Sequence, residues 1–354
     1  MSELIFTTDA AGELERLVAE IRPDRIFIVT PRGLRGILLA KVCGKWSDRA
    51  TVLSITDDEE HKSLDSAEVL WRQMLEADAT RHSLIVNIGG GVTTDLGGFA
   101  AACYMRGIRY LNVPTTLLAM VDASTGGKTG VNLDGVKNIV GAFRQPLATV
   151  VCPAFLDTLP ERELLSGYGE MLKHALLCDR QSVKRIISLS PRDVSPDRWL
   201  GLIQESVEIK RKTVESDPLE QGLRKMLNLG HTAGHAIESL SHSGLWDSAP
   251  LSHGHAVALG LIAALVLSHT VCGFPSDILQ ELSLCVKETY PAVPLKCGHY
   301  DELYRIMRHD KKNDGSGSVS FCLLKEPGKP VLSQPVAKED IFAALDIMRD
   351  LTGI

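Results

Sequence analysis

The segment from Ser83 to Gly98 constrains the fold of this chain more than any other. An apolar run, Ser83 to Ile88 (SLIVNI), leads into the glycine-rich stretch Gly89 to Gly98 (GGGVTTDLGG), which continues as a helical pattern. A strand, a glycine turn and a helix in this order are typical of dinucleotide-binding domains, because glycines let the backbone approach a pyrophosphate and a helix N-terminus favours its charge. The spacing is not Gly-x-Gly-x-x-Gly, so a tight turn without a ligand remains the alternative.

Similar strand patterns recur through the first 150 residues and then stop. They cover residues 25–30, 51–55, 110–113 and 149–152, with helical patterns between them, and this alternation predicts a parallel α/β sheet. Beyond Pro153, amphipathic stretches predict long helices at 161–177, 199–214, 229–240 and 255–270, with few strands. We therefore expect an α/β domain over residues 1–153 and a mainly helical domain over residues 154–354.

Charge and composition exclude several classes of protein. Lys and Arg total 38 against 44 Asp and Glu, which leaves a net charge of −6 and no positive field for a nucleic acid. The N-terminus MSELIFTTDA lacks the pattern of a signal peptide, and the longest apolar run, Ala256 to Leu267, is about half of what a bilayer crossing needs. The eight cysteines follow no disulfide spacing. We expect a cytoplasmic protein without a nucleic-acid or membrane partner.

A second glycine loop precedes two basic residues. Gly126 to Thr129 (GGKT) looks like the end of a P-loop, but Asp122 stands where the first glycine of that motif would fall, so an ATPase is excluded. What remains is a loop that presents Lys128 and is followed by Lys137-Asn138 among small residues. Small residues leave room for a ligand, although a loop packed against a neighbouring domain would look the same.

Histidines crowd one part of the second half. Five of the eleven lie between His231 and His255. Neutral histidine ligates zinc, and His231 and His235 share one helix face at i, i+4. We expect a carboxylate from Glu170, near the start of a helix with Lys173 one turn away. Capping and core hydrogen bonds are the alternative for any single histidine, and the Thr-Ala-Gly between His231 and His235 excludes the His-Glu-x-x-His protease motif.

Basic residues gather locally in this acidic chain. Arg106 and Arg224 each lie in an otherwise apolar stretch, so we expect their guanidinium groups in the interior, where they would suit a phosphate. Others, in Lys210 to Lys212 and Asp310 to Asn313, include solvated surface residues. Any anionic ligand must be bound by such local groups rather than by the overall field.

Taken together, these motifs resemble the 3-dehydroquinate synthase family of the sugar-phosphate cyclases. The resemblance runs through most of the chain and is carried by Gly89–Gly98, Tyr104–Gly107, Val113–Lys128, Lys137-Asn138, Leu227–Glu238, Ser252–Gly254 and Asp310–Lys312. It implies a Rossmann-like first domain, a helical second domain, one NAD, one zinc or cobalt ion and a homodimer.

The resemblance also implies roles for individual residues. The metal ligands are Glu170, His231 and His253, whereas His235 faces the substrate phosphate. This ligand set replaces the i, i+4 pair of His231 and His235 that spacing alone suggests. The residues facing NAD are Glu59, Lys62, Gly90, Gly91, Val92, Asp95, Thr115, Thr116, Asp122, Lys128 and Lys137. The catalytic residues are Lys128, Lys173, Lys210, Arg224, Asn228 and His235, and the substrate-binding residues are Arg106, Asp122, Asn138 and Lys311, with Lys312 as an alternative to Lys311.

The implied reaction converts 3-deoxy-D-arabino-heptulosonate 7-phosphate into 3-dehydroquinate and phosphate, a step of the shikimate pathway. NAD oxidises carbon 5 transiently, phosphate is eliminated, the ketone is reduced again, and an internal aldol step closes the ring. Zinc would lower the pKa of the hydroxyl that is oxidised. Alternatives are another sugar-phosphate cyclase, a metal-dependent alcohol or glycerol dehydrogenase, and a catalytically silent NAD-sensing or scaffold protein.

Two positions depart from the family pattern. His255 stands where the family often has glutamate after His-Gly, and Asp58 replaces the usual glycine before Glu59. The first changes a hydrogen-bond acceptor into a group that can also donate or carry charge beside the metal. We predict that His255 is not a metal ligand and that the second departure alters only the adenosine pocket.

Overall fold

The chain folds into two compact units. The computed structural model describes all residues except 1, 125, 135, 218–221 and 309–317. The first unit runs to Pro160 and includes Ser195–Val207, and the second comprises Glu161–Val194 and Glu208–Ile354. The sequence analysis placed the division at residue 153, whereas the units divide where helix α5 begins.

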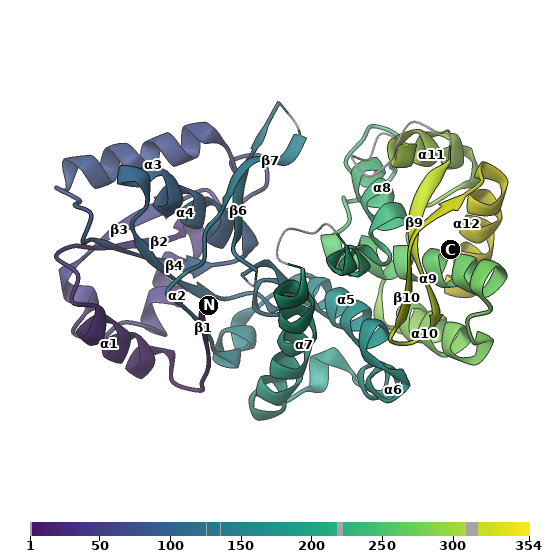
Figure 1. The fold of residues 1–354 in the computed structure, drawn as a ribbon, viewed down its shortest axis with the longest axis horizontal. Coiled ribbons are helices and arrows are strands. Elements are labelled where there is room, and N and C mark those ends of the chain that lie inside the picture. Colours follow the sequence, from purple (N-terminus) through teal and green to yellow (C-terminus); the bar gives the residue numbers. More distant parts are fainter. Residues whose placement is uncertain (1, 125, 135, 218–221, 309–317) are drawn as a thin grey trace. The chain divides into compact units, whose positions relative to one another are not determined.

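A six-stranded sheet forms the centre of the first unit (Figure 1). Its strand order is β1 (Glu3–Phe6), β8 (Ala148–Val151), β5 (Arg109–Pro114), β4 (Leu84–Gly89), β2 (Ile26–Pro31) and β3 (Ala50–Ile55), and every neighbouring pair is parallel. The five predicted strands are confirmed as β2, β3, β4, β5 and β8. The short edge strand β1 was not predicted.

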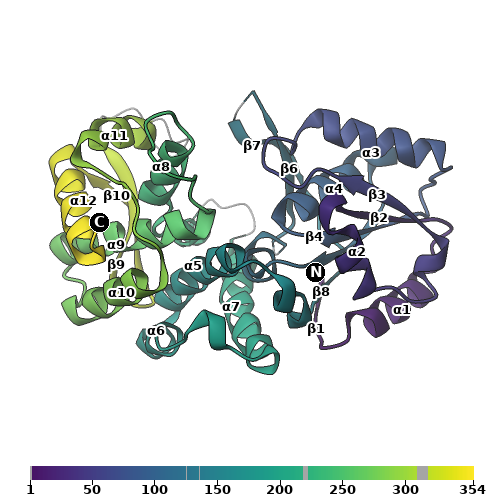
Figure 2. The same cartoon turned by 180° about the vertical axis from the view of Figure 1, so that it is seen from behind.

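Burial explains why these segments form a parallel sheet. Every residue of β2 and β4 is buried, which fits strands covered on both faces. Helices α3 (Leu64–Glu76) and α4 (Gly91–Cys103) pack on one face, where Phe27, Leu70 and Ile85 belong to the core. Helix α1 (Ala10–Ile21) and the short helix α2 (Arg35–Ala40) lie on the other face, as both views show (Figures 1 and 2).

The predicted strand, glycine turn and helix are confirmed. Gly89 ends β4, Gly90 caps the helix, and Gly91 begins α4. Strand β2 has β3 on one side and β4 on the other, so the chain direction across the sheet switches between β2 and β4. In parallel sheets, ligands bind outside the carboxyl ends of the strands at such a switch point. The glycine turn lies at this end of β4.

A hairpin of two antiparallel strands, β6 (Lys128–Leu133) and β7 (Val136–Phe143), was predicted only as a loop. Gly130 and Gly141 face each other across it, and a Cβ added to Gly141 would lie 2.3 Å from the carbonyl oxygen of Thr129. The glycines that suggested room for a ligand therefore also allow close strand pairing.

The second unit is mainly helical and also contains a β-hairpin (Figure 2). Its helices are α5 (Glu161–Cys178), α6 (Arg180–Ile187), the C-terminal part of α7 (Pro196–Ser216), α8 (His231–Ser241), α9 (His253–Cys272), α10 (Ser276–Thr289), α11 (Tyr300–Arg308) and α12 (Lys338–Thr352). The four predicted helices are confirmed as α5, α7, α8 and α9. The hairpin of β9 (Val319–Glu326) and β10 (Lys329–Val336), which was not predicted, packs on α9 through β9.

Helix α9 is the core helix of the second unit. It is long and apolar enough to cross a membrane by length and composition, but 78% of the relevant window is buried inside the protein. The sequence estimate, based on Ala256 to Leu267 alone, understated the length of this apolar element. Its composition is explained by burial against α5, α8, α12 and β9.

Candidate active site

Three helices of the second unit approach one another at glycines. A Cβ added to Gly169 of α5 would lie 2.2 Å from the carbonyl oxygen of Gly254 in α9. A Cβ added to Gly260 of α9 would lie 2.1 Å from the carbonyl oxygen of Gly230, the residue before α8. Such contacts leave no space for any other residue type. Three of these glycines each adjoin one predicted metal ligand in the sequence, namely Glu170, His231 or His253.

These contacts bring the three predicted ligands together. Oε1 of Glu170 lies 3.3 Å from Nε2 of His231 and 3.2 Å from Nε2 of His253. A tetrahedral zinc ion with bonds of about 2.0–2.1 Å separates its ligand atoms by about 3.3 Å. The donor atoms present therefore fit a zinc-sized ion, with two nitrogens and one oxygen as ligands.

The second nitrogen of each ring is held by a different acceptor. Nδ1 of His231 lies 3.1 Å from the carbonyl oxygen of Leu229, and Nδ1 of His253 lies 3.1 Å from Oε2 of Glu238. When Nδ1–H donates to such an acceptor, Nε2 keeps its lone pair for a metal. Both rings are therefore oriented for coordination through Nε2.

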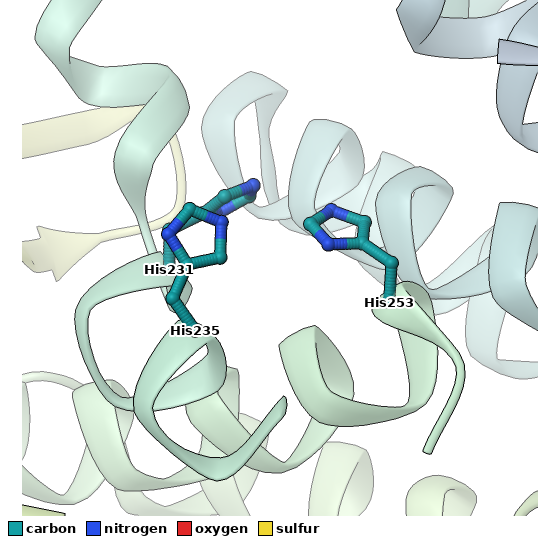
Figure 3. A group of neighbouring side chains, drawn as sticks. All are labelled: His231, His235 and His253. Atoms are coloured by element: carbon teal, nitrogen blue, oxygen red, sulfur yellow. The ribbon is translucent and has the colours of Figure 1, made fainter. Parts of the chain in front are cut away.

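His235 lies beside the same group. Its ring centroid is 5.0 Å from that of His231 and 5.7 Å from that of His253, and Figure 3 shows the three rings turned toward one another. Ligand atoms of all three histidines lie within 4.8 Å of one another. The geometry brings together both predicted sets, the i, i+4 pair and the set with Glu170, and the short distances to Glu170 favour the second.

Charges at this site are strongly coupled. Glu170 is fully buried and forms an ion pair with Lys173, one turn further along α5. Burial raises the pKa of Glu170, but Lys173 and His231 outweigh burial and hold that pKa well below its usual range. Burial lowers the pKa of His253, but hydrogen bonds to Glu170 and Glu238 raise it to about 10. Burial has the largest effect on His231 and lowers its pKa, and the positive charge of Lys173 lowers it further.

Glu170 and Lys173 lie together in α5. Glu170 lies in the middle of α5 rather than near its start, because the helix begins at Glu161. The expected placement of Lys173 next to Glu170 is confirmed.

Buried cations are a further feature of the second unit. Lys173, Lys210 and Arg224 are 1%, 7% and 2% exposed, although lysine and arginine are almost never buried without a counterion. Arg224 and Asn228 belong to one short 3-10 segment, Leu223–Asn228. The expectation of an interior Arg224 is confirmed. Lys311 and Lys312 lie outside the described residues.

Arg106 contradicts the expectation of an interior guanidinium. It is exposed and follows α4 in a short turn where its own φ is +66°. The apolar residues just before it are not buried either, because Cys103 and Met105 are exposed and Tyr104 is only partly buried. Its role in binding substrate stays a prediction.

In the first unit, the residues predicted to face NAD follow the carboxyl ends of three strands of the parallel sheet. Glu59 and Lys62 follow β3; Gly90, Gly91, Val92 and Asp95 follow β4; Thr115, Thr116 and Asp122 follow β5. The backbone N–H of Thr115 donates to the carbonyl oxygen of Gly89 at 2.9 Å. This is the edge at which a dinucleotide binds in sheets of this kind.

Lys62 connects this edge to the β6–β7 hairpin. It is 3% exposed, and its Nζ lies 2.5 Å from Oδ2 of Asp95 and 2.7 Å from Oδ1 of Asn138. Asn132 extends the network, since its side chain donates to Oε1 of Glu59 at 3.0 Å and accepts from the backbone N–H of Asn138 at 2.8 Å. Residues predicted to face NAD and one predicted to face substrate thus form a single network.

Sequence reasoning missed three residues near these sites: Asp57, Asn132 and Glu238. Oδ1 of Asp57 accepts a hydrogen bond from Oγ1 of Thr93 at 2.9 Å. An acidic residue two positions after a predicted strand could have identified Asp57, whereas the contacts of Asn132 and Glu238 depend on tertiary structure. Lys128 and Lys137 are exposed on the hairpin.

The two departures from the family pattern have different surroundings. His255 is buried, stacks on Tyr290 at 4.8 Å between ring centroids, and has no hydrogen-bond partner for Nε2 among the described residues. Burial, with a smaller effect of Arg162, lowers its pKa to about 4. Asp58 is exposed and pairs with His61 at 2.7 Å. The prediction that His255 is not a ligand agrees with this position and stays a prediction.

Comparison with solved structures defines the class of fold. The chain superposes on 2-deoxy-scyllo-inosose synthase, solved with carbaglucose-6-phosphate, NAD+ and Co2+, with a TM-score of 0.86 and 24% identity over 98% of this chain and 96% of the other. It superposes on 2-epi-5-epi-valiolone synthase from Streptomyces hygroscopicus subsp. jinggangensis, solved with NAD+ and Zn2+, with a TM-score of 0.82 and 22% identity over 99% and 97%. The fold is the one that these synthases share.

Sequence comparison defines the family within this fold. Residues 52–166 match the N-terminal model of 3-dehydroquinate synthase, and residues 167–313 match its C-terminal model. The 3-dehydroquinate synthase of Parabacteroides distasonis is 41% identical over 357 residues, covering 100% of both chains. This chain belongs to the 3-dehydroquinate synthase family, which confirms the resemblance and the expected fold class.

Proposed function

We propose that the chain is a 3-dehydroquinate synthase, which converts 3-deoxy-D-arabino-heptulosonate 7-phosphate into 3-dehydroquinate and phosphate in the shikimate pathway. The observation that carries this proposal is the position of Oε1 of Glu170, 3.3 Å from Nε2 of His231 and 3.2 Å from Nε2 of His253, in a member of this family. A lyase of this kind needs a metal, a redox cofactor and anion-binding groups in one protein. The chain offers residues for all three.

Glu170, His231 and His253 would hold a divalent ion, zinc or cobalt. Two of the similar solved synthases contain Co2+ or Zn2+ together with NAD+. When bound, such an ion lowers the pKa of a coordinated hydroxyl. The site supports this because Lys173 keeps Glu170 ionised and the Nδ1 atoms of both histidines face acceptors.

NAD would bind at the glycine turn between β4 and α4. The N-terminus of α4 offers backbone N–H groups to a pyrophosphate, and Gly90 and Gly91 lack side chains that would obstruct it. NAD held there would supply reversible hydride transfer, with no net change of the cofactor over a turnover. Asp95 and Glu59, which are held by Lys62 and Asn132, would line the same site.

The buried basic residues would bind the anionic groups of the substrate. Guanidinium and ammonium groups removed from water make strong hydrogen bonds to phosphate and carboxylate, which suits Arg224, Lys210 and Lys173. Asn228, His235 and Lys128 would orient the sugar in a single conformer. The substrate phosphate can take the proton during its own elimination, so a dedicated protein base is unnecessary at that step.

A second candidate function is the cyclisation of a different sugar phosphate, and the likeness of the fold to two other cyclases favours it. Those synthases are 24% and 22% identical, whereas the 3-dehydroquinate synthase of Parabacteroides distasonis is 41% identical over the full length. A metal-dependent alcohol dehydrogenase would release NADH, and the synthase would not. We further propose a homodimer in the cytoplasm, without a nucleic-acid or membrane partner.

The test is to supply the heptulosonate phosphate with Zn2+ or Co2+ and a catalytic amount of NAD, and to follow phosphate and dehydroquinate together. We expect equal amounts of both products and no accumulation of NADH. Other phosphorylated sugars serve as matched substrates. Phosphate without the carbocycle, sustained NADH release, or faster turnover of another sugar phosphate would overturn the assignment.

A further inference from the structure

We propose that Glu238 is a positioning residue of the metal site, which holds the ring of His253 so that Nε2 faces the metal. This inference deepens the proposed metal site and rests on it. Oε2 of Glu238 lies 3.1 Å from Nδ1 of His253, and Oε1 of Glu170 lies 3.2 Å from Nε2 of the same ring. The ring is therefore held by one carboxylate on each of its two nitrogens.

The two carboxylates cannot have the same role. A metal between Glu170 and Nε2 of His253 requires a lone pair on Nε2, so the remaining proton of the neutral ring must be on Nδ1. A carboxylate is the strongest acceptor available to that N–H group, and it also makes the opposite nitrogen a better donor to the metal. Glu238 is at the correct nitrogen for this function.

Helix α8 places Glu238 with another ligand. His231 begins α8, and Glu238 follows seven residues later on the same helix. Residues at i and i+7 share one face. Gly230 lies against Gly260 and Gly234 lies against Ala256, so α8 runs antiparallel to α9 and its later turns, with Glu238, approach the start of α9, where His253 lies. One helix thus supplies a metal ligand and the carboxylate that orients the next ligand.

The burial of Glu238 also requires an explanation. Its exposure is 9%, and burial of a carboxylate is unfavourable unless it has a partner. The ring of His253 is such a partner. His255, two residues further along, does not take over this role, because its ring stacks on Tyr290 and the described residues offer its Nε2 no hydrogen bond.

The experiment compares Glu238→Ala and Glu238→Gln with the unmodified protein. Zinc affinity is measured by competition with a chelator, without substrate or NAD, and the tautomer of His253 is read from 15N NMR of the zinc-loaded protein, in which one ring nitrogen binds the metal and the other carries the proton. We expect zinc to bind about 10–100-fold more weakly in Glu238→Ala, as for other residues that orient metal ligands. Glu238→Gln should lose less, because its amide oxygen still accepts from Nδ1–H.

Two controls separate positioning from a structural role. Glu281→Gln changes an exposed glutamate of α10 and should leave zinc affinity and the His253 tautomer unchanged. The melting temperature of each metal-free variant shows whether it folds. A variant that melts like the unmodified protein but binds zinc weakly, with His253 no longer protonated mainly at Nδ1, would support the proposal.

The result that overturns the proposal is zinc binding of unmodified strength in Glu238→Ala. If Glu238→Ala does not fold, the same comparison is made with Glu238→Leu, which fills the space without a hydrogen-bond acceptor, and an unchanged affinity together with an unchanged tautomer there overturns it. Failure of the proposed metal site is distinguishable, because the unmodified protein would then bind no zinc and Glu170→Ala would change nothing. If the unmodified protein binds zinc and makes dehydroquinate, but substitution of Glu238 leaves zinc affinity unchanged, only the positioning role of Glu238 is contradicted.

Discussion

Gly169 of α5 and Gly254 of α9 pack backbone against backbone, so that a Cβ added to Gly169 would lie 2.2 Å from the carbonyl oxygen of Gly254. Alanine at either position must push the helices apart, and the adjoining residues Glu170 and His253 would move with them. We expect Gly254→Ala to lower the free energy of unfolding by about 1–3 kcal/mol, as overpacking does, and to weaken zinc binding. Urea unfolding and chelator competition measure the two effects.

Gly201 provides a matched control for this prediction. It lies on the exposed side of α7, and a Cβ there would meet nothing within 4 Å. Gly201→Ala should therefore stabilise the protein slightly, by about 0.5–1 kcal/mol, because alanine favours a helix over glycine. If Gly201→Ala and Gly254→Ala change the free energy of unfolding and the zinc affinity equally, the close contact of α5 and α9 is not the cause of the effect of Gly254→Ala.

The ion pair of Glu170 and Lys173 makes a separate prediction about stability. Both side chains are almost fully buried, so Glu170→Gln leaves a buried ammonium without its charged partner. Removal of one partner from a buried pair costs about 3–5 kcal/mol, which urea unfolding of the metal-free protein would show. The double variant Glu170→Gln/Lys173→Met should recover much of that loss. Additive losses in the double variant would contradict the coupling.

His255 should make stability depend on acidity. Burial lowers its pKa from near 6.5 to about 4, so as pH falls below 6.5 the unfolded chain takes up a proton that the folded chain does not. The free energy of unfolding should therefore fall between pH 6.5 and pH 4, with a contribution from this group of about 3 kcal/mol. Denaturant titrations across this range measure it.

His255→Gln removes this titration and should flatten the profile between pH 6.5 and pH 4. The exposed His82 gives the matched variant, His82→Gln, which should keep the full slope. Parallel profiles for His255→Gln and the unmodified protein would show that another group is responsible for any acid destabilisation.

Lys62 should affect both stability and NAD binding in the first unit. It donates to Asp95 and Asn138 from a buried position, so Lys62→Met removes hydrogen bonds to a charged group worth about 2 kcal/mol. If Asp95 and its neighbours line the NAD site, NAD should also bind about tenfold more weakly in calorimetry. Lys45→Met, at an exposed position of the same unit, is the control. Unchanged NAD affinity in Lys62→Met would show that the hydrogen bonds of Lys62 do not contribute to NAD binding.

The sequence patterns predicted the parallel sheet because β2 and β4 are mainly apolar, fully buried runs, and they predicted α5, α7, α8 and α9 because helical periodicity is strong there. They did not predict the β6–β7 or β9–β10 hairpins. The strand β7 is largely exposed and lacks a continuous apolar run, and β1 is short and lies at an edge. Such strands depend on pairing with partners distant in sequence, which a local pattern does not contain.

The same limit applies to the candidate site. Residue type and resemblance selected Glu170, His231 and His253, but spacing alone would have paired His231 with His235. Only tertiary structure shows that Glu238 reaches Nδ1 of His253 and that Lys62 joins Asp95 to Asn138. Arg106 was misjudged because apolar neighbours in sequence do not determine where a single side chain points.

Metal binding should release one proton in the neutral pH range. Hydrogen bonds to Glu170 and Glu238 raise the pKa of His253 to about 10, so its ring carries a proton that zinc must displace from Nε2. The pKa values of His231 and Glu170 are lowered, so neither of these ligands has a proton to lose. The apparent zinc affinity should therefore rise about tenfold per pH unit between roughly pH 7 and pH 8.5. Calorimetry in two buffers of different ionisation enthalpy counts the protons. His82→Gln should release one proton as well, and a count of zero or two would contradict the assignment of charge within this group.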